Sequence, residues 1–136
     1  MLITIEKVLV LKQMPLFKTV SYMALSDLMA VSEEKTLKKN TVLIDGTKQN
    51  RFVYFILSGG AATEDGTQSF YEHEAVGLDS VFWVSMAGKT IKTTETCVVL
   101  KVGRDKLYRM MALHPSLATA ILHELSNQIH QSGKKD

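Results

Sequence analysis

The sequence predicts an α+β fold in which helices at both ends of the chain flank an antiparallel β-sandwich or barrel. The chain has 136 residues, of which 46% are apolar, enough for one domain with a sizeable core. Apolar residues recur at helical spacing near both termini. Between them, short stretches rich in β-branched and aromatic residues follow one another without the long crossovers that parallel strands need.

Two helices are expected at the N-terminus, within residues 1–32. The first lies between Ile3 and Met14, and its apolar stripe consists of Ile5, Val8, Leu9 and Leu11. Pro15 ends it, because proline disfavours helical geometry at the residue before it. Ser21 is expected to begin the second helix, whose apolar side consists of Met23, Leu25, Leu28, Met29 and Val31.

About eight short strands are expected over residues 33–103, where the helical period is lost. The clearest strand is Phe52–Leu57, a run of β-branched and aromatic residues. Glu64–Gly66 supplies the close turn of a hairpin between Ala61–Thr63 and Gln68–Tyr71. Such closely spaced strands favour an antiparallel arrangement.

Helices are expected again over residues 104–131, followed by a frayed tail over 132–136. His114-Pro115 separates two of them, since proline suits the first turn of a new helix. The sequence contains no repeat, low-complexity segment or internal linker. We therefore expect a single domain over residues 1–136.

Composition argues against several classes of function. Sixteen Lys and Arg against fourteen Asp and Glu give a net charge of +2, far from the positive charge typical of a dedicated nucleic-acid binder. The single cysteine, Cys97, excludes an intramolecular disulfide and a multi-cysteine metal site. No apolar run approaches the ~18 residues of a membrane span, and no signal peptide is recognisable, so a cytoplasmic protein is expected. Without an elbow serine, paired carboxylates or a metal motif, no enzymatic activity or metal site is expected.

Four short motifs accompany this order of elements: Pro15-Leu16-Phe17, Asp45-Gly46, Tyr54–Gly59 and Leu107–Pro115. Over roughly 4–129, their order and spacing resemble those of the cyclic-nucleotide-binding domain. This module is shared by catabolite-activator-type regulators, cyclic-nucleotide-dependent kinases and cyclic-nucleotide-gated channels. The resemblance implies a jelly-roll β-sandwich with flanking helices and a role in regulation and signal transduction.

In that family a phosphate-binding cassette holds the ligand: typically Phe-Gly-Glu-(Leu/Met)-Ala-Leu and, a few residues later, Arg-(Ser/Thr)-Ala. Backbone N–H groups of a short helix cradle the phosphate, the arginine pairs with its charge, and the glutamate holds the ribose hydroxyl. The resemblance places the cassette here at Val76, Gly77, Leu78, Asp79, Ser80, Ala87, Gly88, Lys89 and Thr90. The glycine is present. Leu78 stands in the place of the glutamate, and Ala87 in the place of the arginine.

Two hypotheses about function follow. The first is a regulatory or interaction domain whose degenerate pocket does not bind ordinary cyclic nucleotides tightly. Both charged contacts are missing, and no arginine lies between Phe52 and Gly103 that a shifted alignment could supply. The alternative is a small-molecule sensor that binds cAMP, cGMP or another anionic ligand through an atypical cassette. Lys89 would then carry the charge, although lysine lacks arginine's bidentate fork, and Asp79 lies one place from the glutamate position.

The last expected helix carries an apolar stripe wider than one packing seam requires: Leu117, Ala118, Ile121, Leu122, Leu125 and Ile129. In the family this helix often pairs with its counterpart, so the resemblance implies a homodimer through it. The usual helix-turn-helix partner does not follow it in this sequence, so we expect no binding of nucleic acid by this chain alone. Whether the chain is a whole protein or part of a larger one is left open.

Overall fold

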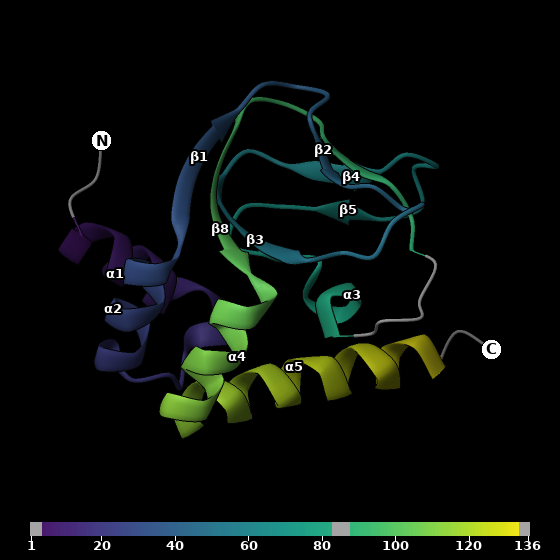
Figure 1. The fold of residues 1–136 in the computed structure, drawn as a ribbon. Coiled ribbons are helices and arrows are strands. Elements are labelled where there is room, and N and C mark those ends of the chain that lie inside the picture. The colour runs from purple at the N-terminus through teal and green to yellow at the C-terminus, as the bar shows by residue number, and fades with distance from the viewer. Residues whose placement is uncertain (1–3, 83–87, 134–136) are drawn as a thin grey trace. The chain divides into compact units, whose positions relative to one another are not determined.

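The computed structural model describes residues 4–82 and 88–133 (Figure 1). Its helices are α1 (Thr4–Gln13), the 3-10 helix η1 (Pro15–Phe17), α2 (Tyr22–Val31), α3 (Leu78–Phe82), α4 (Arg104–Leu113) and α5 (Pro115–Gly133). Its strands are β1 (Glu33–Leu37), β2 (Val42–Ile44), β3 (Phe52–Ser58), β4 (Ala61–Thr63), β5 (Ser69–Phe70), β6 (Ala75–Val76), β7 (Ile91–Thr93) and β8 (Cys97–Gly103). The predicted order of helices, strands and helices is confirmed.

The chain forms two compact units. Met1–Ala30 and Leu107–Asp136 make up a helical unit, and Val31–Lys106 makes up a β-roll unit. No helix among the residues that the structure describes is both long enough and apolar enough to cross a bilayer.

In the helical unit, the N-terminal helices form where the sequence predicts them. Helix α1 ends before Pro15, and Ser21 caps α2 by accepting a hydrogen bond from the Ala24 N–H at 3.1 Å from Oγ. The Lys12 ammonium group donates to the Val20 carbonyl and lies 5.0 Å from the centroid of the Tyr22 ring. These contacts join the end of α1 to the start of α2.

The C-terminal helices are separated at His114, as predicted. The His114 carbonyl accepts hydrogen bonds from the N–H groups of Leu117 and Ala118, at the start of α5. Its imidazole Nε2 lies 2.8 Å from Asp27 Oδ2, which connects this corner to α2. Helix α5 extends to Gly133, a little beyond its expected end near residue 131. Helix ends fray, and a difference of one or two residues at the last turn is common.

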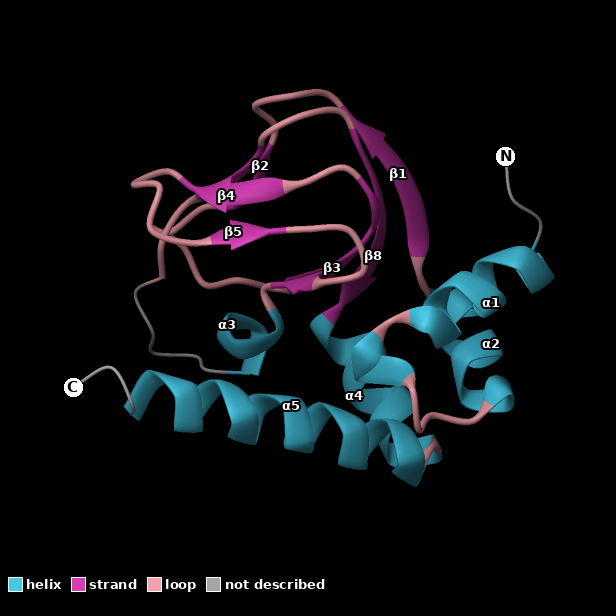
Figure 2. Ribbon diagram, turned by 180° about the vertical axis from the view of Figure 1, so that it is seen from behind, coloured by secondary structure: helices cyan, strands magenta, loops and turns pink. Residues whose placement is uncertain are grey.

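The β-roll unit consists of two four-stranded antiparallel sheets with strand orders β1-β8-β3-β6 and β2-β7-β4-β5. This arrangement confirms the expected jelly roll. Figure 2 shows β4 and β5 side by side in one sheet and β3 beside β8 in the other. The core of the roll is made of Leu43, Ile44, Tyr54, Ile56, Ala61, Val76, Ile91, Cys97 and Val99.

The strongest strand signal in the sequence corresponds to the most buried strand. Residues 53–57 of β3 are all buried, because β3 lies between β8 and β6 and is covered on both faces. The predicted hairpin also forms, with Ala61 opposite Phe70 and Ala62 opposite Ser69 in the register of β4 and β5. Its turn, at Glu64–Gly66, borders the candidate site.

Candidate ligand-binding cassette

The cassette begins where β6 leaves the sheet beside β3. Val76 pairs with Tyr54, and the next residue, Gly77, has a φ of +89°. A Cβ at Gly77 would lie 2.7 Å from both the Asn50 side-chain nitrogen and Ile44 Cδ1. The positive φ therefore favours glycine here, and a Cβ would in addition force the Asn50 and Ile44 side chains to shift.

Helix α3 follows directly and packs against β3. Leu78 is fully buried at its first position, with 1% of its surface exposed. The family's ribose-binding carboxylate would occupy this position, and the apolar side chain offers no hydrogen-bond acceptor there. Leu78 therefore contributes to the core rather than to a polar contact with a ligand.

Asp79 and Ser80 form hydrogen bonds within the cassette region. The exposed Asp79 carboxylate accepts a hydrogen bond from the Ser80 N–H at 2.8 Å, and Ser80 Oγ accepts one from Asn50 Nδ2 at 2.9 Å. In the family, backbone N–H groups of this first turn cradle the phosphate. Here the Asp79 carboxylate accepts a hydrogen bond from one of these groups, the Ser80 N–H.

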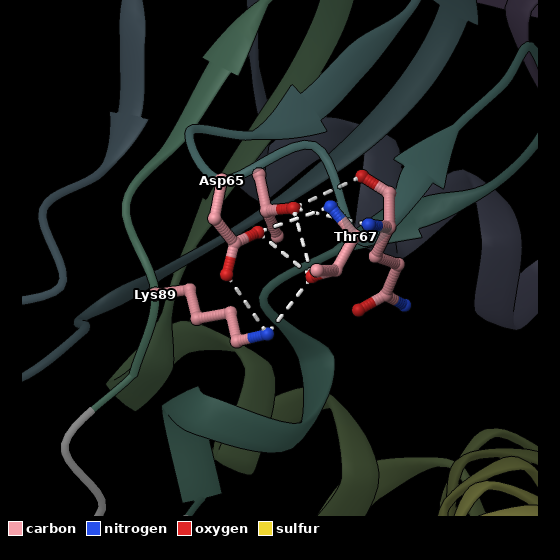
Figure 3. A network of polar contacts seen from close by, with 5 residues as sticks. Asp65, Thr67 and Lys89 are labelled. Atoms are coloured by element: carbon pink, nitrogen blue, oxygen red, sulfur yellow. Dashed lines mark hydrogen bonds and ion pairs between the residues drawn. The ribbon is translucent and has the colours of Figure 1, made fainter.

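Lys89 lies on the approach to β7, and its ammonium group is paired (Figure 3). Its Nζ is 3.1 Å from Asp65 Oδ2 and donates to Thr67 Oγ1 at 2.8 Å. The other Asp65 oxygen accepts hydrogen bonds from the Thr67 hydroxyl at 2.7 Å and the Thr67 N–H at 3.0 Å. The turn of the β4–β5 hairpin thus supplies a fixed carboxylate to the candidate phosphate-binding cation.

These contacts determine the ionisation of Asp65. The Thr67 hydroxyl has the largest effect and, together with the Thr67 N–H and the Lys89 ammonium, holds the pKa of the Asp65 carboxyl well below its usual range. The carboxylate is therefore charged at neutral pH. Half of each side chain is exposed, 58% for Lys89 and 49% for Asp65, so water screens the pair.

A second ion pair joins the same two segments. Glu64, next to Asp65 in the turn, has its Oε2 2.8 Å from Nζ of Lys92 in β7. An open hollow of about 330 Å³ is lined by Glu64, Asp65, Lys89 and Thr90. Two carboxylates and one ammonium group line it, so its lining is not suited to an anionic ligand.

Gly88 and Thr90 form part of the wall of the roll. Thr90 Oγ1 accepts a hydrogen bond from the Gly46 N–H at 3.1 Å, and the Thr90 carbonyl accepts one from the Glu64 N–H at 2.8 Å. The turn at Gly46 approaches this segment so closely that a Cβ would lie 2.5 Å from the Gly88 carbonyl oxygen. Ala87, in the place of the family's arginine, lies outside the described residues.

Asn50, in the loop before β3, has a role that sequence reasoning missed. Its Nδ2 donates to the Phe52 carbonyl at 2.8 Å, the Gly77 carbonyl at 3.2 Å and Ser80 Oγ at 2.9 Å. Its Oδ1 accepts the Phe52 N–H at 3.1 Å. Asparagine before a strand is an ordinary turn signal, and its partners in the cassette are 27 and 30 positions away.

No family model matches the chain, and no curated protein matches its sequence. Solved structures do match its fold. The sensor domain of the transcriptional regulator DNR from Pseudomonas aeruginosa has a TM-score of 0.75 at 18% identity, over 98% of this chain and 95% of that one. The Thermus thermophilus catabolite activator protein has a TM-score of 0.75 at 14% identity, over 89% of this chain and 61% of that one.

A third match is the regulatory domain of Toxoplasma gondii PKA, solved with cAMP. Its TM-score is 0.68 at 19% identity, over 79% of this chain and 44% of that one. All three neighbours are regulatory or sensor proteins, or domains of them. The chain therefore has the fold of the cyclic-nucleotide-binding regulatory domains.

Proposed function

We propose that the chain is a cyclic-nucleotide-binding-like regulatory or interaction module whose pocket does not bind ordinary cyclic nucleotides tightly. The observation that carries the proposal is the pairing of Lys89 with Asp65 and Thr67. Lys89 is the only basic residue at the nine cassette positions named above. Its charge is already compensated within the chain.

A bound phosphate would meet an unfavourable arrangement of charges. To reach the Lys89 ammonium group it would have to displace the Asp65 carboxylate or lie beside it, and like charges at such distances repel. The family's two charged contacts are also missing at Leu78 and Ala87. Loss of one buried, charge-assisted contact costs about 2–5 kcal/mol. Two such losses take a micromolar ligand to millimolar affinity or weaker, at ~1.4 kcal/mol per tenfold change.

The proposed module spans residues 1–136 as one domain, acts in the cytoplasm and catalyses no reaction. The regulatory and sensor roles of its structural neighbours support this assignment. Its signal would be a change of conformation or of association, which requires a partner that binds one state better than another.

We further propose self-association through α5, on a smaller face than the sequence predicts. Leu117 and Ile121 are fully buried within the chain and are not available to a partner. Leu122 is 62% exposed, and Leu125 is half-buried. The side chain of Ile129 lies outside the described residues. The candidate dimer face is therefore centred on Leu122.

The alternative is a sensor of cAMP, cGMP or another anion, using Gly77, Asp79, Lys89 and Thr90. The observation in its favour is the exposure of Lys89, whose side chain is 58% accessible to solvent. A thermal-shift titration with each nucleotide, to millimolar concentration, separates the two functions. A ligand at ~100 times its Kd adds ~2.7 kcal/mol of stability, which raises the Tm of a domain of this size by several degrees. We expect no saturable shift; a saturable shift with either nucleotide would establish the sensor and refute the degenerate pocket.

A further inference from the structure

Two arginines of the β-roll unit are neighbours at the point where β3 begins and β8 ends. Phe52 pairs with Gly103 in the register of these strands, so the next positions place Arg51 opposite Arg104. The Arg104 N–H donates to the Arg51 carbonyl at 2.9 Å, which holds the two backbones together. Residues opposite each other in antiparallel strands have Cβ atoms about 5 Å apart. Two guanidinium groups can therefore reach one small ligand from neighbouring segments.

The positive charges of this pair are not compensated by the part of the chain that the structure describes. Among residues 4–82 and 88–133, neither side chain forms a hydrogen bond or an ion pair. Asp105 follows Arg104 directly, and its carboxylate is exposed and pairs with neither arginine. Arg51 is exposed and Arg104 is half-buried. Both guanidinium groups are therefore open to a ligand.

Stability alone favours a neutral pair at these positions, because like charges directly opposite each other on neighbouring strands are destabilising. Only three of the sixteen basic residues of the chain are arginines: Arg51, Arg104 and Arg109. Two of the three occupy this one pair of positions. A further cation lies close by, since Lys101 Nζ is 4.1 Å from the centroid of the Phe52 ring. Positive charge is thus concentrated at one end of the β3–β8 pair.

We propose that Arg51 and Arg104 together bind a phosphate monoester group. The planar guanidinium group presents paired N–H donors whose spacing matches the oxygens of phosphate. A phosphate monoester carries about 1.5 to 2 negative charges at pH 7, which two arginines compensate. A cyclic nucleotide carries a phosphodiester with a single negative charge, so this site favours a different ligand. It lies outside the cassette positions and does not depend on the proposed function.

The experiment is an NMR titration of the full chain at constant ionic strength. The probes are inorganic phosphate, a short phosphoserine peptide and the same peptide without phosphate. We expect the backbone N–H signals of Phe52 and Arg104 to shift saturably with the first two probes and not with the third. An affinity about tenfold higher for the phosphopeptide supports the site and makes a phosphorylated partner protein the source of the group. Equal affinities support it with a small phosphate ligand as the source. No saturable shift with either phosphate probe would overturn the site.

Variants test whether the two arginines hold the phosphate. Arg51→Gln and Arg104→Gln should each weaken its binding about fivefold to tenfold, the effect of losing a charge-assisted hydrogen bond. Arg51→Lys keeps the charge but loses the bidentate fork, so its affinity should lie between those of Arg51→Gln and the unmodified chain. Arg109→Gln is the matched control, because Arg109 is an exposed arginine and its loss changes the net charge equally. It should weaken binding less than about twofold, since salt screens distant charges. Equal weakening by all three glutamine variants would overturn the site.

The melting temperature of the same variants gives a second measurement. Removing either charge of a repelling pair should raise the Tm by about 1–3 °C for a domain of this size. This result would also show that the variants fold, so that weaker binding reports on the site itself. A Tm lowered by several degrees in both Arg51→Gln and Arg104→Gln would show that the guanidinium groups serve the fold, and it would overturn the assignment.

Discussion

Lys89 and Asp65 form an ion pair, with 3.1 Å between Nζ and Oδ2, that joins the approach to β7 with the turn of the β4–β5 hairpin. The hydroxyl of Thr67 bonds to both partners and holds them in one geometry. Asp65 thereby pairs with the cation, Lys89, that an atypical cassette would offer to a phosphate. The chain itself therefore supplies the anion at this site.

Asp65→Asn should make the site more receptive to anions. The variant removes the repelling carboxylate and leaves the Lys89 ammonium group without its counter-ion. We expect the affinity for inorganic phosphate to rise about threefold to tenfold, because the phosphate then no longer lies a few Å from the negative charge of Asp65. The measurement is an NMR titration that follows the residues around Lys89.

Glu64→Gln is the matched control for that experiment, because it breaks the neighbouring pair with Lys92 and leaves Lys89 with its partner. It should change phosphate affinity less than Asp65→Asn. Equal effects of the two variants would show that phosphate affinity depends only on net charge and that the pairing of Asp65 with Lys89 does not control it.

Stability should depend on pH through Asp65 in a predictable direction. The pKa of this carboxyl is lowered in the folded state, chiefly by the Thr67 hydroxyl. A lowered folded pKa contributes stability above the unfolded pKa of about 3.9, and this contribution is lost as the pH falls further towards the folded pKa. The Tm difference between the unmodified chain and Asp65→Asn should therefore be constant from about pH 7 to pH 5 and shrink below about pH 4. A difference that grows on acidification would contradict the assignment.

Gly77→Ala should be strongly destabilising. The new Cβ would meet Asn50 and Ile44 at 2.7 Å, and alanine is strained at a φ of +89°. We expect the free energy of unfolding in urea to fall by about 2 kcal/mol or more. Gly66→Ala is the control, since Gly66 has a φ of +76° with nothing within 4 Å of the added Cβ. It tests the backbone strain alone and should cost about 1 kcal/mol.

Leu122→Asp should weaken self-association if α5 forms the dimer. A charge placed in an apolar interface loses its hydration, so we expect a dimer Kd at least about tenfold weaker by analytical ultracentrifugation. Leu113→Asp on α4 is the control, because Leu113 has the same exposed fraction of 62%. A chain that is monomeric at high concentration before any substitution would refute the dimer.

The order of elements could be predicted from the sequence because its signals are local, whereas the jelly roll was expected from the resemblance to the cyclic-nucleotide-binding domain. The buried run in β3, the turn at Glu64–Gly66 and the break at His114-Pro115 each lie within a few residues. The short strand β6 has only two residues, too few for a periodic signal, and its pairing with β3 depends on the rest of the sheet.

The contacts that define the site could not be predicted, because they join residues that are distant in sequence. Thr67 and Lys89 are 22 positions apart, and Asn50 and Ser80 are 30 apart. Each is a residue type common in solvated turns, where it needs no partner. The motif comparison identified Lys89 as a candidate for the phosphate charge. It could not identify the carboxylate beside it, because Asp65 belongs to a hairpin turn outside the cassette.

The crowding around Gly77 bears on how sequences of this kind are classified. A glycine at this point of the cassette is easily taken as a mark of ligand recognition, because there the backbone would approach a phosphate. In this chain the atoms that a side chain would meet are the protein's own: Asn50, Ile44 and the Phe52 carbonyl. Sequence profiles that give weight to this glycine will therefore also select chains in which the β6–α3 corner alone accounts for it. Discrimination between the two groups has to come from the charged positions around the glycine.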